Sequence, residues 1–429
     1  MEEYTSTPTK ITRHTIISNI ATLFTGSAIA QGLTAITFIL TARILGPEQY
    51  GQYTASMTLA IFCSIVFSLG LNLWLLQEGG RRSSQIGNLI GSVLFIKILL
   101  GLVYLMLMIV LASLINNSSL PANLVRLSAL IVWLHNLFVT SLTAFKAVLR
   151  NKTTAVLETV LATVILFFTL ILIASNVGKA ANYMQMRAII LFFSFLVALL
   201  LVKVLLQSNS SWITAKFVLS KTPPYAASEF LAWMYMRVDV LIIAIMLDEY
   251  AVGLYAPAAG IIIALYLLPS AINFVFIPVL SKLFATNIRQ GWLTAKRLII
   301  LLVIVGFSLF IAVLFGAKYF VLLLGSSFAG SQVVLQILSI ILFIHSISFG
   351  LAAILVANNQ QTQRSIIQAI TVAINIGLNL IVVRRVGIYG VAYVYVITEV
   401  ILLVGYLFLV LRFRHKTSTN LSSIRSEIR

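Results

Sequence analysis

The stretch Ala226–Leu247 reads AASEFLAWMYMRVDVLIIAIML and is long and apolar enough to cross a lipid bilayer as a helix. It nevertheless carries Arg237 and Asp239, which a rise of about 1.5 Å per residue places roughly 17–20 Å from its start, near the midplane. Ionisable groups at this depth are costly and usually face protein or a water-filled cavity. Because the two residues are two apart, they point to nearly opposite sides of a helix and cannot pair with each other, so we expect each to need a partner or water from another helix.

The chain as a whole has the same apolar character. Of its 429 residues, 60% are hydrophobic and only 9% are charged, and the mean hydropathy is +1.06. This is the composition of an integral membrane protein rather than of a soluble domain. Because the apolar runs reach about 20 residues, the spans are expected to be helices and not barrel strands. We therefore predict an all-α polytopic membrane protein, whose single cysteine, Cys63, provides no disulfide framework.

Twelve apolar runs, separated by short loops, are long enough to be membrane-spanning helices. They cover residues 16–40, 53–76, 87–113, 123–146, 154–174, 184–206, 226–247, 252–280, 296–315, 332–356, 365–383 and 389–411. We expect them to form two six-helix halves around a central cavity. The corresponding divisions are an N-terminal half at 1–206, a cytoplasmic linker at 207–225, a C-terminal half at 226–411 and a basic cytoplasmic tail at 412–429. Within the linker, residues 212–219 favour a short amphipathic helix on the membrane surface.

The net charge of +18 is distributed in a way that indicates membrane topology rather than nucleic-acid binding. Lys and Arg are scattered through the short loops between apolar runs. With the N-terminus placed in the cytoplasm, the inner segments carry 20 of these residues and the outer segments carry 7. Because basic residues accumulate on the cytoplasmic side, this bias predicts an even number of spans with both termini cytoplasmic.

Internal repetition indicates how the spans are organised. The stretch LGPEQYGQY at residues 45–53 follows the first span, and LDEYAVGLY at residues 247–255 follows the seventh, with Leu, Gly and Tyr matching at an offset of 202. In the fourth and tenth spans, WLH at residues 133–135 matches FIH at residues 343–345 at an offset of 210. These landmarks predict two halves of even span number that share one orientation and are related by an axis along the membrane normal.

The stretch TARILGPEQYGQY at residues 41–53 resembles the first-loop motif of the polysaccharide-transport flippases. These include the O-antigen flippases and belong to the multidrug/oligosaccharidyl-lipid/polysaccharide exporter superfamily. RVD at residues 237–239 and GLY at residues 253–255 resemble the second-half counterpart, and PSA at 269–271 with PVLS at 278–281 resembles the eighth span. The arginine-rich first span of the lipid II flippases, which share the fold, is not found in this sequence.

The resemblance implies a flippase that carries a lipid-linked (polyprenyl pyrophosphate) oligosaccharide from the inner to the outer leaflet by alternating access. The product would serve the assembly of a cell-surface polysaccharide. The implied location is the cell (inner) membrane of a bacterium or archaeon. The implied partners are the lipid-linked oligosaccharide, membrane lipids, a polysaccharide polymerase and glycosyltransferases, with no nucleic acid and with the chain acting as a monomer.

Ionisable residues from both halves fall near the midplane. They are Lys97, His135, Arg237, Asp239, His345 and Glu399. A cavity between the halves that is lined by Lys97, Arg237 and the two histidines would attract an anionic pyrophosphate. Arginine suits this role because its planar fork can bind two phosphate oxygens. We therefore predict substrate-binding roles for these four residues.

Each of these residues also has a structural interpretation. Lys97 can extend its ammonium group toward one membrane interface. Arg237 and Asp239 can pair with other helices, and a histidine can form a hydrogen bond between helices. Glu399 can be a protonated residue that only packs against its neighbours.

Tyrosines and prolines in or next to the spans also have structural interpretations. Tyr50, Tyr53 and Tyr255 are interpreted as members of the aromatic belt at the membrane interfaces. Pro269 and Pro278 of the eighth span are candidate hinges, because proline removes a backbone hydrogen bond and bends a helix.

No motif for a metal, a catalytic nucleophile or a nucleotide is present in the sequence, so we expect no cofactor and no metal site. Transport would then draw on an ion gradient or on removal of the product by later steps. Asp239 and Glu399 are the only carboxylates near the midplane. A carboxylate at low dielectric can exchange a proton or hold sodium as a cavity alternates between sides, so we predict ion-coupling roles for both.

Three other functions compete with a flippase, and one of them, a receptor or scaffold, is disfavoured by the paired halves and the midplane charges. An ion-coupled drug/cation antiporter of the same superfamily needs a cavity rich in carboxylates and aromatic residues, whereas Lys97 and Arg237 favour an anion. A membrane polysaccharide-modifying enzyme needs catalytic groups in a sizeable loop, and the loops here are short. We therefore predict a transporter and not an enzyme.

Overall fold

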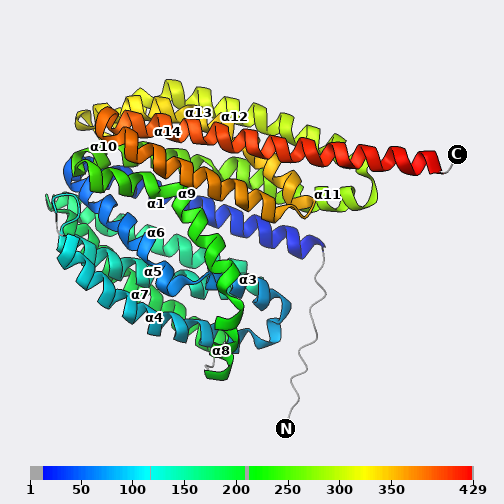
Figure 1. Cartoon of the computed structure of the whole chain (residues 1–429). Coiled ribbons are helices and arrows are strands. Elements are labelled where there is room, and N and C mark those ends of the chain that lie inside the picture. The colour runs from blue at the N-terminus through cyan, green and yellow to red at the C-terminus, as the bar shows by residue number, and fades with distance from the viewer. Residues whose placement is uncertain (1–12, 116, 208–211, 428–429) are drawn as a thin grey trace, which may run out of the picture. The chain divides into compact units, whose positions relative to one another are not determined.

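The structure is a computed structural model that describes residues 13–115, 117–207 and 212–427. Every secondary-structure element in these ranges is a helix (Figure 1). The elements are α1 Arg13–Cys63, α2 Ile65–Ser68, α3 Leu71–Arg81, η1 Ser83–Gln85, α4 Ile86–Ile115, α5 Ala122–Ala147, α6 Asn151–Ala174, α7 Ala180–Leu206, α8 Trp212–Lys221, α9 Pro223–Met246, α10 Glu249–Leu265, α11 Leu267–Thr286, α12 Ile288–Leu324, η2 Ser326–Phe328, α13 Ala329–Ala357 and α14 Gln361–Glu427. The predicted all-α fold is confirmed.

Nine helical stretches of the described residues are long and apolar enough to cross a membrane. Two of them hold two spans each, because α1 changes direction at Gly46 (φ 68°) and α14 at Gly387 (φ 65°). Glycine adopts a positive φ without steric cost, which explains its presence at both points. With α9, which contains the predicted seventh span, these helices account for the twelve predicted spans. The chain is a multi-pass membrane protein.

The predicted second span, residues 53–76, is not a continuous helix. It is divided among three helices, namely the end of α1, the short α2 and α3. Leu69 and Gly70, which precede α3, both have a positive φ. A Cβ atom on Gly70 would lie 2.3 Å from the backbone of Tyr225, so the close approach of Tyr225 requires glycine here. Because the apolar run continues through this break, hydropathy carries no signal for it.

The chain packs into two compact units. The first consists of the described residues up to 44 with 59–116 and 121–230, and the second consists of 45–58, 117–120 and the residues from 231 onward. Two segments of the predicted N-terminal half, part of α1 and a loop, therefore belong to the second unit. The predicted linker contains α8, so the expected short helix is confirmed, whereas the predicted domain boundaries stay a prediction.

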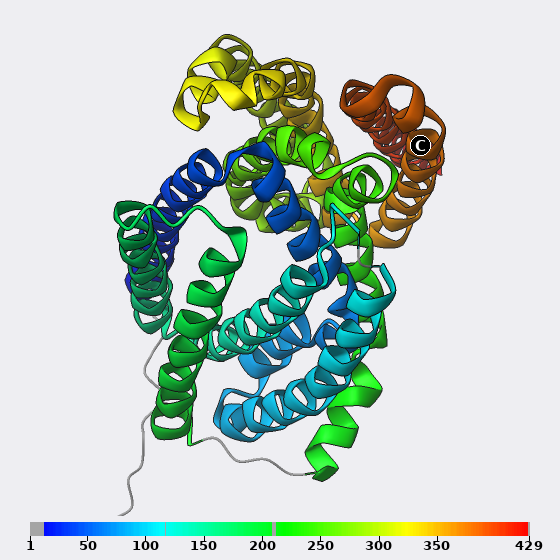
Figure 2. The same ribbon diagram turned by 90° about the vertical axis from the view of Figure 1, so that its left-hand side faces the viewer.

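In the first unit, α5 is the central helix and packs against α3, α4, α6 and α7 (Figure 2). Helix α4 also carries Met106 and Leu114, which are 70% and 77% exposed. Exposed apolar side chains of this kind suit a helix that faces lipid. The short helix α8 packs on α4.

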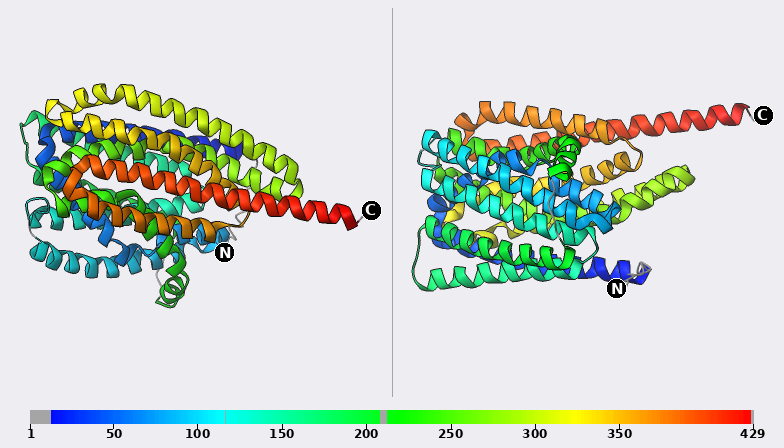
Figure 3. Two further views of the ribbon diagram at one scale, coloured as in Figure 1. Left: turned by 45° about the horizontal axis from the view of Figure 1, so that its top comes forward. Right: turned by 90° about the horizontal axis from the view of Figure 1, so that it is seen from below.

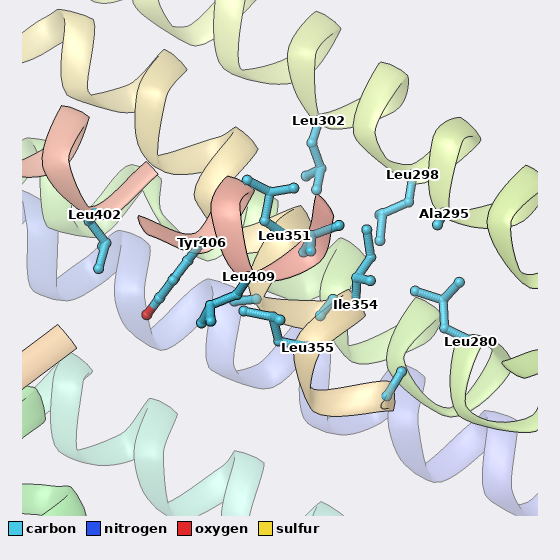
Figure 4. Packing of buried hydrophobic residues seen from close by; sticks show 14 residues of the cluster. Leu280, Ala295, Leu298, Leu302, Leu351, Ile354, Leu355, Leu402, Tyr406 and Leu409 are labelled. Atoms are coloured by element: carbon cyan, nitrogen blue, oxygen red, sulfur yellow. The ribbon is translucent and has the colours of Figure 1, made fainter. Parts of the chain in front are cut away.

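In the second unit, α13 is the central helix and packs against α10, α11, α12 and α14. Figure 4 shows part of this core, where Leu298 and Leu302 of α12 point toward Ile354 and Leu351 of α13, and Leu409 of α14 lies beside Leu355 of α13. The C-terminal end of α14 extends past α12 and α13 (Figure 3). The core thus fixes the helices that carry His345 and Glu399.

The two repeated motifs contact each other within the second unit. A Cβ atom on Gly51 would lie 1.8 Å from the carbonyl oxygen of Glu249, and a Cβ atom on Gly253 would lie 1.8 Å from the carbonyl oxygen of Pro47. The offset of 202 that relates Gly51 to Gly253 also relates Pro47 to Glu249. The contact is therefore reciprocal: each glycine packs on the carbonyl four residues before the other. We call this contact the glycine crossing.

Candidate functional site

A buried polar cluster of the second unit surrounds Glu399 of α14, whose side chain is fully buried. His345 Nδ1 of α13 lies 2.9 Å from Glu399 Oε2, and the Tyr235 hydroxyl of α9 donates to Oε1. The ring of Tyr266 stacks on His345 with centroids 4.2 Å apart, and its hydroxyl lies 3.5 Å from that of Tyr395. The structure thus brings together His345, predicted for substrate binding, and Glu399, predicted for ion coupling.

This arrangement is suited to holding a proton. A buried carboxylate is tolerated when it is paired and its oxygens are hydrogen-bonded, and both oxygens of Glu399 have such a partner. One proton shared between the imidazole of His345 and the carboxylate can leave or return without a large movement of either side chain.

Asp239 of α9 is also buried, with 5% of its surface exposed. Its carboxylate accepts hydrogen bonds from the Tyr255 hydroxyl of α10 and from the Val240 N–H, the latter at 2.8 Å. The predicted partner on another helix is therefore confirmed. The interpretation of Tyr255 and Tyr50 as interfacial belt residues is wrong, because they are 0% and 3% exposed. The Tyr255 hydroxyl is instead used to satisfy a buried carboxylate.

Arg237 lies two residues before Asp239 and is half-buried. Within the described part of the chain its guanidinium group makes no hydrogen bond and no ion pair. A guanidinium group in an apolar span with its donors unused by protein is positioned to bind an anion.

Lys97 of α4 differs from Arg237, because its ammonium group is fully buried and fully engaged. It donates to Asn72 Oδ1 of α3 at 2.8 Å, and to Asn136 Oδ1 and Thr140 Oγ1 of α5 at 2.6 and 2.9 Å. All three ammonium hydrogens therefore have an acceptor. The indole N–H of Trp133 on α5 donates to the backbone carbonyl of Lys97 on α4 at 3.1 Å, which links the two helices at this point. We call these three oxygens the Lys97 cage.

The two histidines of the repeat lie in different surroundings. His135 of α5 is exposed, whereas His345 of α13 is 8% exposed and bound to Glu399. Their substrate-binding roles stay a prediction.

The two candidate hinge prolines lie in α11. The helix breaks at Tyr266, between α10 and α11, and Pro269 follows in the first turn of α11. The ring of a proline excludes the helical carbonyl four residues earlier, here that of Leu265, the last residue of α10. Pro278 is inside α11. The position of the break is thus explained, and hinge motion stays a prediction.

The partners of these groups were not identified from the sequence. Tyr235, Tyr266 and Tyr395 around Glu399 are scattered in the chain, and no spacing relates them. Asn72 and Asn136 did carry a signal, because amides inside apolar runs usually bond to other helices in a membrane.

Solved structures of known transporters share this fold. An inward-facing conformation of a multidrug resistance MATE family transporter of the MOP superfamily aligns with a TM-score of 0.75 at 13% identity, over 90% of this chain and 95% of that one. Lipid II flippase MurJ in an inward closed conformation aligns with a TM-score of 0.69 at 14% identity, over 90% of this chain and 87% of that one. A MOP superfamily transporter from Pyrococcus furiosus aligns with a TM-score of 0.57 at 12% identity, over 93% of this chain and 95% of that one.

At the level of sequence, a family model described as polysaccharide biosynthesis protein matches residues 16–284, more than half of the chain. The chain belongs to the polysaccharide biosynthesis protein family. No protein with curated annotation matches it by sequence.

The family match confirms the resemblance noted from the sequence. The region that this polysaccharide biosynthesis protein shares with its family contains the stretch 41–53 and the RVD segment at 237–239. His345 and Glu399 lie beyond the matched region. The cluster around Glu399 therefore rests on the geometry of this chain alone.

Proposed function

We propose that this protein is a flippase that moves a lipid-linked (polyprenyl pyrophosphate) oligosaccharide from the inner to the outer leaflet by alternating access. Membership of the polysaccharide biosynthesis protein family supports a polysaccharide precursor as the cargo. The fold it shares with transporters supports translocation rather than a chemical reaction. Lipid II flippase MurJ is an example of a protein of this fold with a lipid-linked cargo.

The observation that carries the proposal is the guanidinium group of Arg237. It lies in the predicted seventh span and makes no hydrogen bond or ion pair with the described residues, although its charge interacts with that of Asp239. A pyrophosphate has several anionic oxygens, and two of them match the fork of an arginine. We propose Arg237 as the ligand of the anionic headgroup.

The other predicted substrate residues have more indirect roles in the proposal. The hydrogen bonds of Lys97 are used within the Lys97 cage, so we propose for it an electrostatic role in substrate binding rather than a direct contact. His135 is exposed and can contact the cargo directly. His345 acts through Glu399, which with Asp239 we propose for coupling to protons or sodium.

Substitution of Arg237 tests the headgroup role. In proteoliposomes at equal protein abundance, Arg237→Lys keeps the charge but loses the fork, so flipping of a polyprenyl pyrophosphate oligosaccharide is expected to fall about threefold. Arg237→Ala removes the charge as well and is expected to lower the flipping rate about tenfold, which corresponds to the free energy lost with a hydrogen bond to a charged group.

Arg385→Ala serves as the control, because Arg385 is exposed in the same unit. It is expected to leave the rate unchanged. Equal rates for the native protein and both Arg237 variants would exclude the headgroup role.

A drug/cation antiporter is the second candidate, favoured by the similarity in fold to a multidrug resistance transporter. The buried carboxylates Asp239 and Glu399 fit this function as well. Gradient-driven uptake of a lipophilic cationic dye by the same proteoliposomes, without flipping of the oligosaccharide lipid, would favour the antiporter.

We also propose that both termini lie in the cytoplasm and that the protein resides in the inner membrane of a bacterium or archaeon. The distribution of Lys and Arg supports this orientation. Proteolysis of a C-terminal tag in intact spheroplasts measures it, and cleavage before lysis would contradict it.

A further inference from the structure

A patch of positive charge and exposed apolar surface lies in the first unit where α3 ends. It consists of Arg81 and Arg82 at the end of α3 and of Lys216, Phe217 and Lys221 on α8, all exposed. We call it the α8 patch.

Two cations of the α8 patch share one aromatic ring. Arg82 Cζ lies 5.7 Å and Lys221 Nζ lies 6.0 Å from the centroid of Phe217. Phe217 and Lys221 are four residues apart on α8, so they occupy the same helix face. The only acidic residue of α3 and α8 is Glu78, which lies 2.6 Å from Arg82 Nε and 3.8 Å from Arg81. The patch therefore retains a positive charge.

The helix under the patch is held in place. Val218 of α8 and Thr222 behind it are 0% and 2% exposed, and α8 packs on α4. The Tyr225 hydroxyl, just after α8, donates to Gln77 of α3. The cations of α3 and α8 thus stand at fixed positions relative to each other.

The α8 patch lies at the ends of membrane-spanning helices. α8 packs on α4, whose spanning stretch begins at Ile86. A Cβ atom on Gly87 would lie 2.3 Å from the carbonyl oxygen of Leu206, where the spanning stretch of α7 ends. Both helix ends therefore mark one membrane boundary. Phe217 and Leu219, each 37% exposed, suit the depth of headgroups and upper acyl chains.

We propose that the α8 patch binds the headgroup of an anionic phospholipid. Arg82 and Lys221 contact the phosphate beside Phe217, and the acyl chains pass Phe217 into the bilayer. Charge complementarity selects an anionic over a zwitterionic lipid. This site does not depend on the proposed flippase function.

Lipid binding to the purified full-length protein tests the proposal. Native mass spectrometry measures the apparent Kd for dioctanoyl phosphatidylglycerol and for dioctanoyl phosphatidylcholine. The native protein is expected to prefer phosphatidylglycerol. Each basic residue near an anionic surface contributes about fivefold in affinity, so Arg82→Gln combined with Lys221→Gln should weaken phosphatidylglycerol binding about 25-fold.

Lys318→Gln is the matched control, because Lys318 also lies over an exposed aromatic ring, 4.9 Å from the centroid of Tyr319 in the second unit. It should leave the affinity unchanged, and Arg82→Lys with Lys221→Arg should retain it. If the double variant does not fold, Lys221→Gln alone leaves the Arg82–Glu78 pair intact and should weaken binding about fivefold.

Three outcomes would overturn the proposal. The native protein would bind the two lipids equally, or the Lys221→Gln variant would bind phosphatidylglycerol as tightly as the native protein. Alternatively, inorganic phosphate would displace the lipid at equal concentration, which would identify a site for free phosphate.

Discussion

Replacement of Gly253 by alanine is expected to remove most of the folded protein from the membrane. The new Cβ atom would lie 1.8 Å from the carbonyl oxygen of Pro47 and 2.5 Å from its carbonyl carbon, which are backbone atoms. A flexible side chain could move away at little cost, but here one helix must shift against another. Overpacking of this severity costs about 3 kcal/mol, or about a hundredfold in the ratio of folded to unfolded protein. Gly51→Ala should have the same effect, because the glycine crossing is reciprocal.

Abundance in the membrane, thermal unfolding in detergent and transport at equal abundance measure this effect. Gly316→Ala in α12 is the matched control, since a Cβ atom there would meet nothing within 4 Å. It should be neutral or slightly stabilising, because alanine favours a helix over glycine. If the Gly253→Ala protein has the abundance, unfolding temperature and transport rate of the native protein, then close contact of the two backbones at the glycine crossing is not needed.

Substitution of Glu399 by glutamine is expected to abolish the response of transport to a pH gradient. Glutamine has nearly the same shape but cannot exchange a proton with His345. A gradient of two pH units supplies about 2.7 kcal/mol per proton, which is about a hundredfold in the accumulated product. The variant should lose this factor and keep the flipping that runs down the concentration gradient of the cargo.

Proteoliposomes with imposed proton or sodium gradients measure the response. Tyr235→Phe is the control, because it removes a hydrogen bond to Glu399 and leaves the carboxylate. Asp239→Asn tested in parallel assigns coupling to one carboxylate or the other. If flipping by the native protein ignores both gradients, neither residue couples transport to an ion.

The spans could be predicted because a bilayer imposes a length and an apolar composition on each helix. Turns at Gly46 and Gly387 fall between predicted spans, where a positive φ is available to glycine. The break before α3 could not be predicted, because it depends on the approach of Tyr225 to Gly70, which are far apart in the chain. Local patterns do not encode such contacts.

For the candidate site too, some features could be predicted from the sequence and others could not. Charged residues in apolar spans are conspicuous, so Glu399 and Lys97 could be selected from the sequence. Their partners could not, because the depth of a residue along its helix says nothing about which face it presents to which neighbour. Tyr255 illustrates this point, since a tyrosine that satisfies a buried carboxylate has the same sequence signal as one at the interface.

The Lys97 cage means that the first unit carries its cation as part of the chain. Three neutral oxygens at 2.6 to 2.9 Å surround the ammonium nitrogen, much as they would surround a monovalent metal ion. A tethered ammonium group cannot diffuse away, so its presence in the Lys97 cage does not depend on the salt concentration outside. The buried carboxylates of the second unit are held differently, Asp239 by the Tyr255 hydroxyl and Glu399 by His345 and Tyr235. If they couple transport to protons or sodium as proposed, the first unit has a built-in cation, whereas the second unit takes its cations from the two compartments.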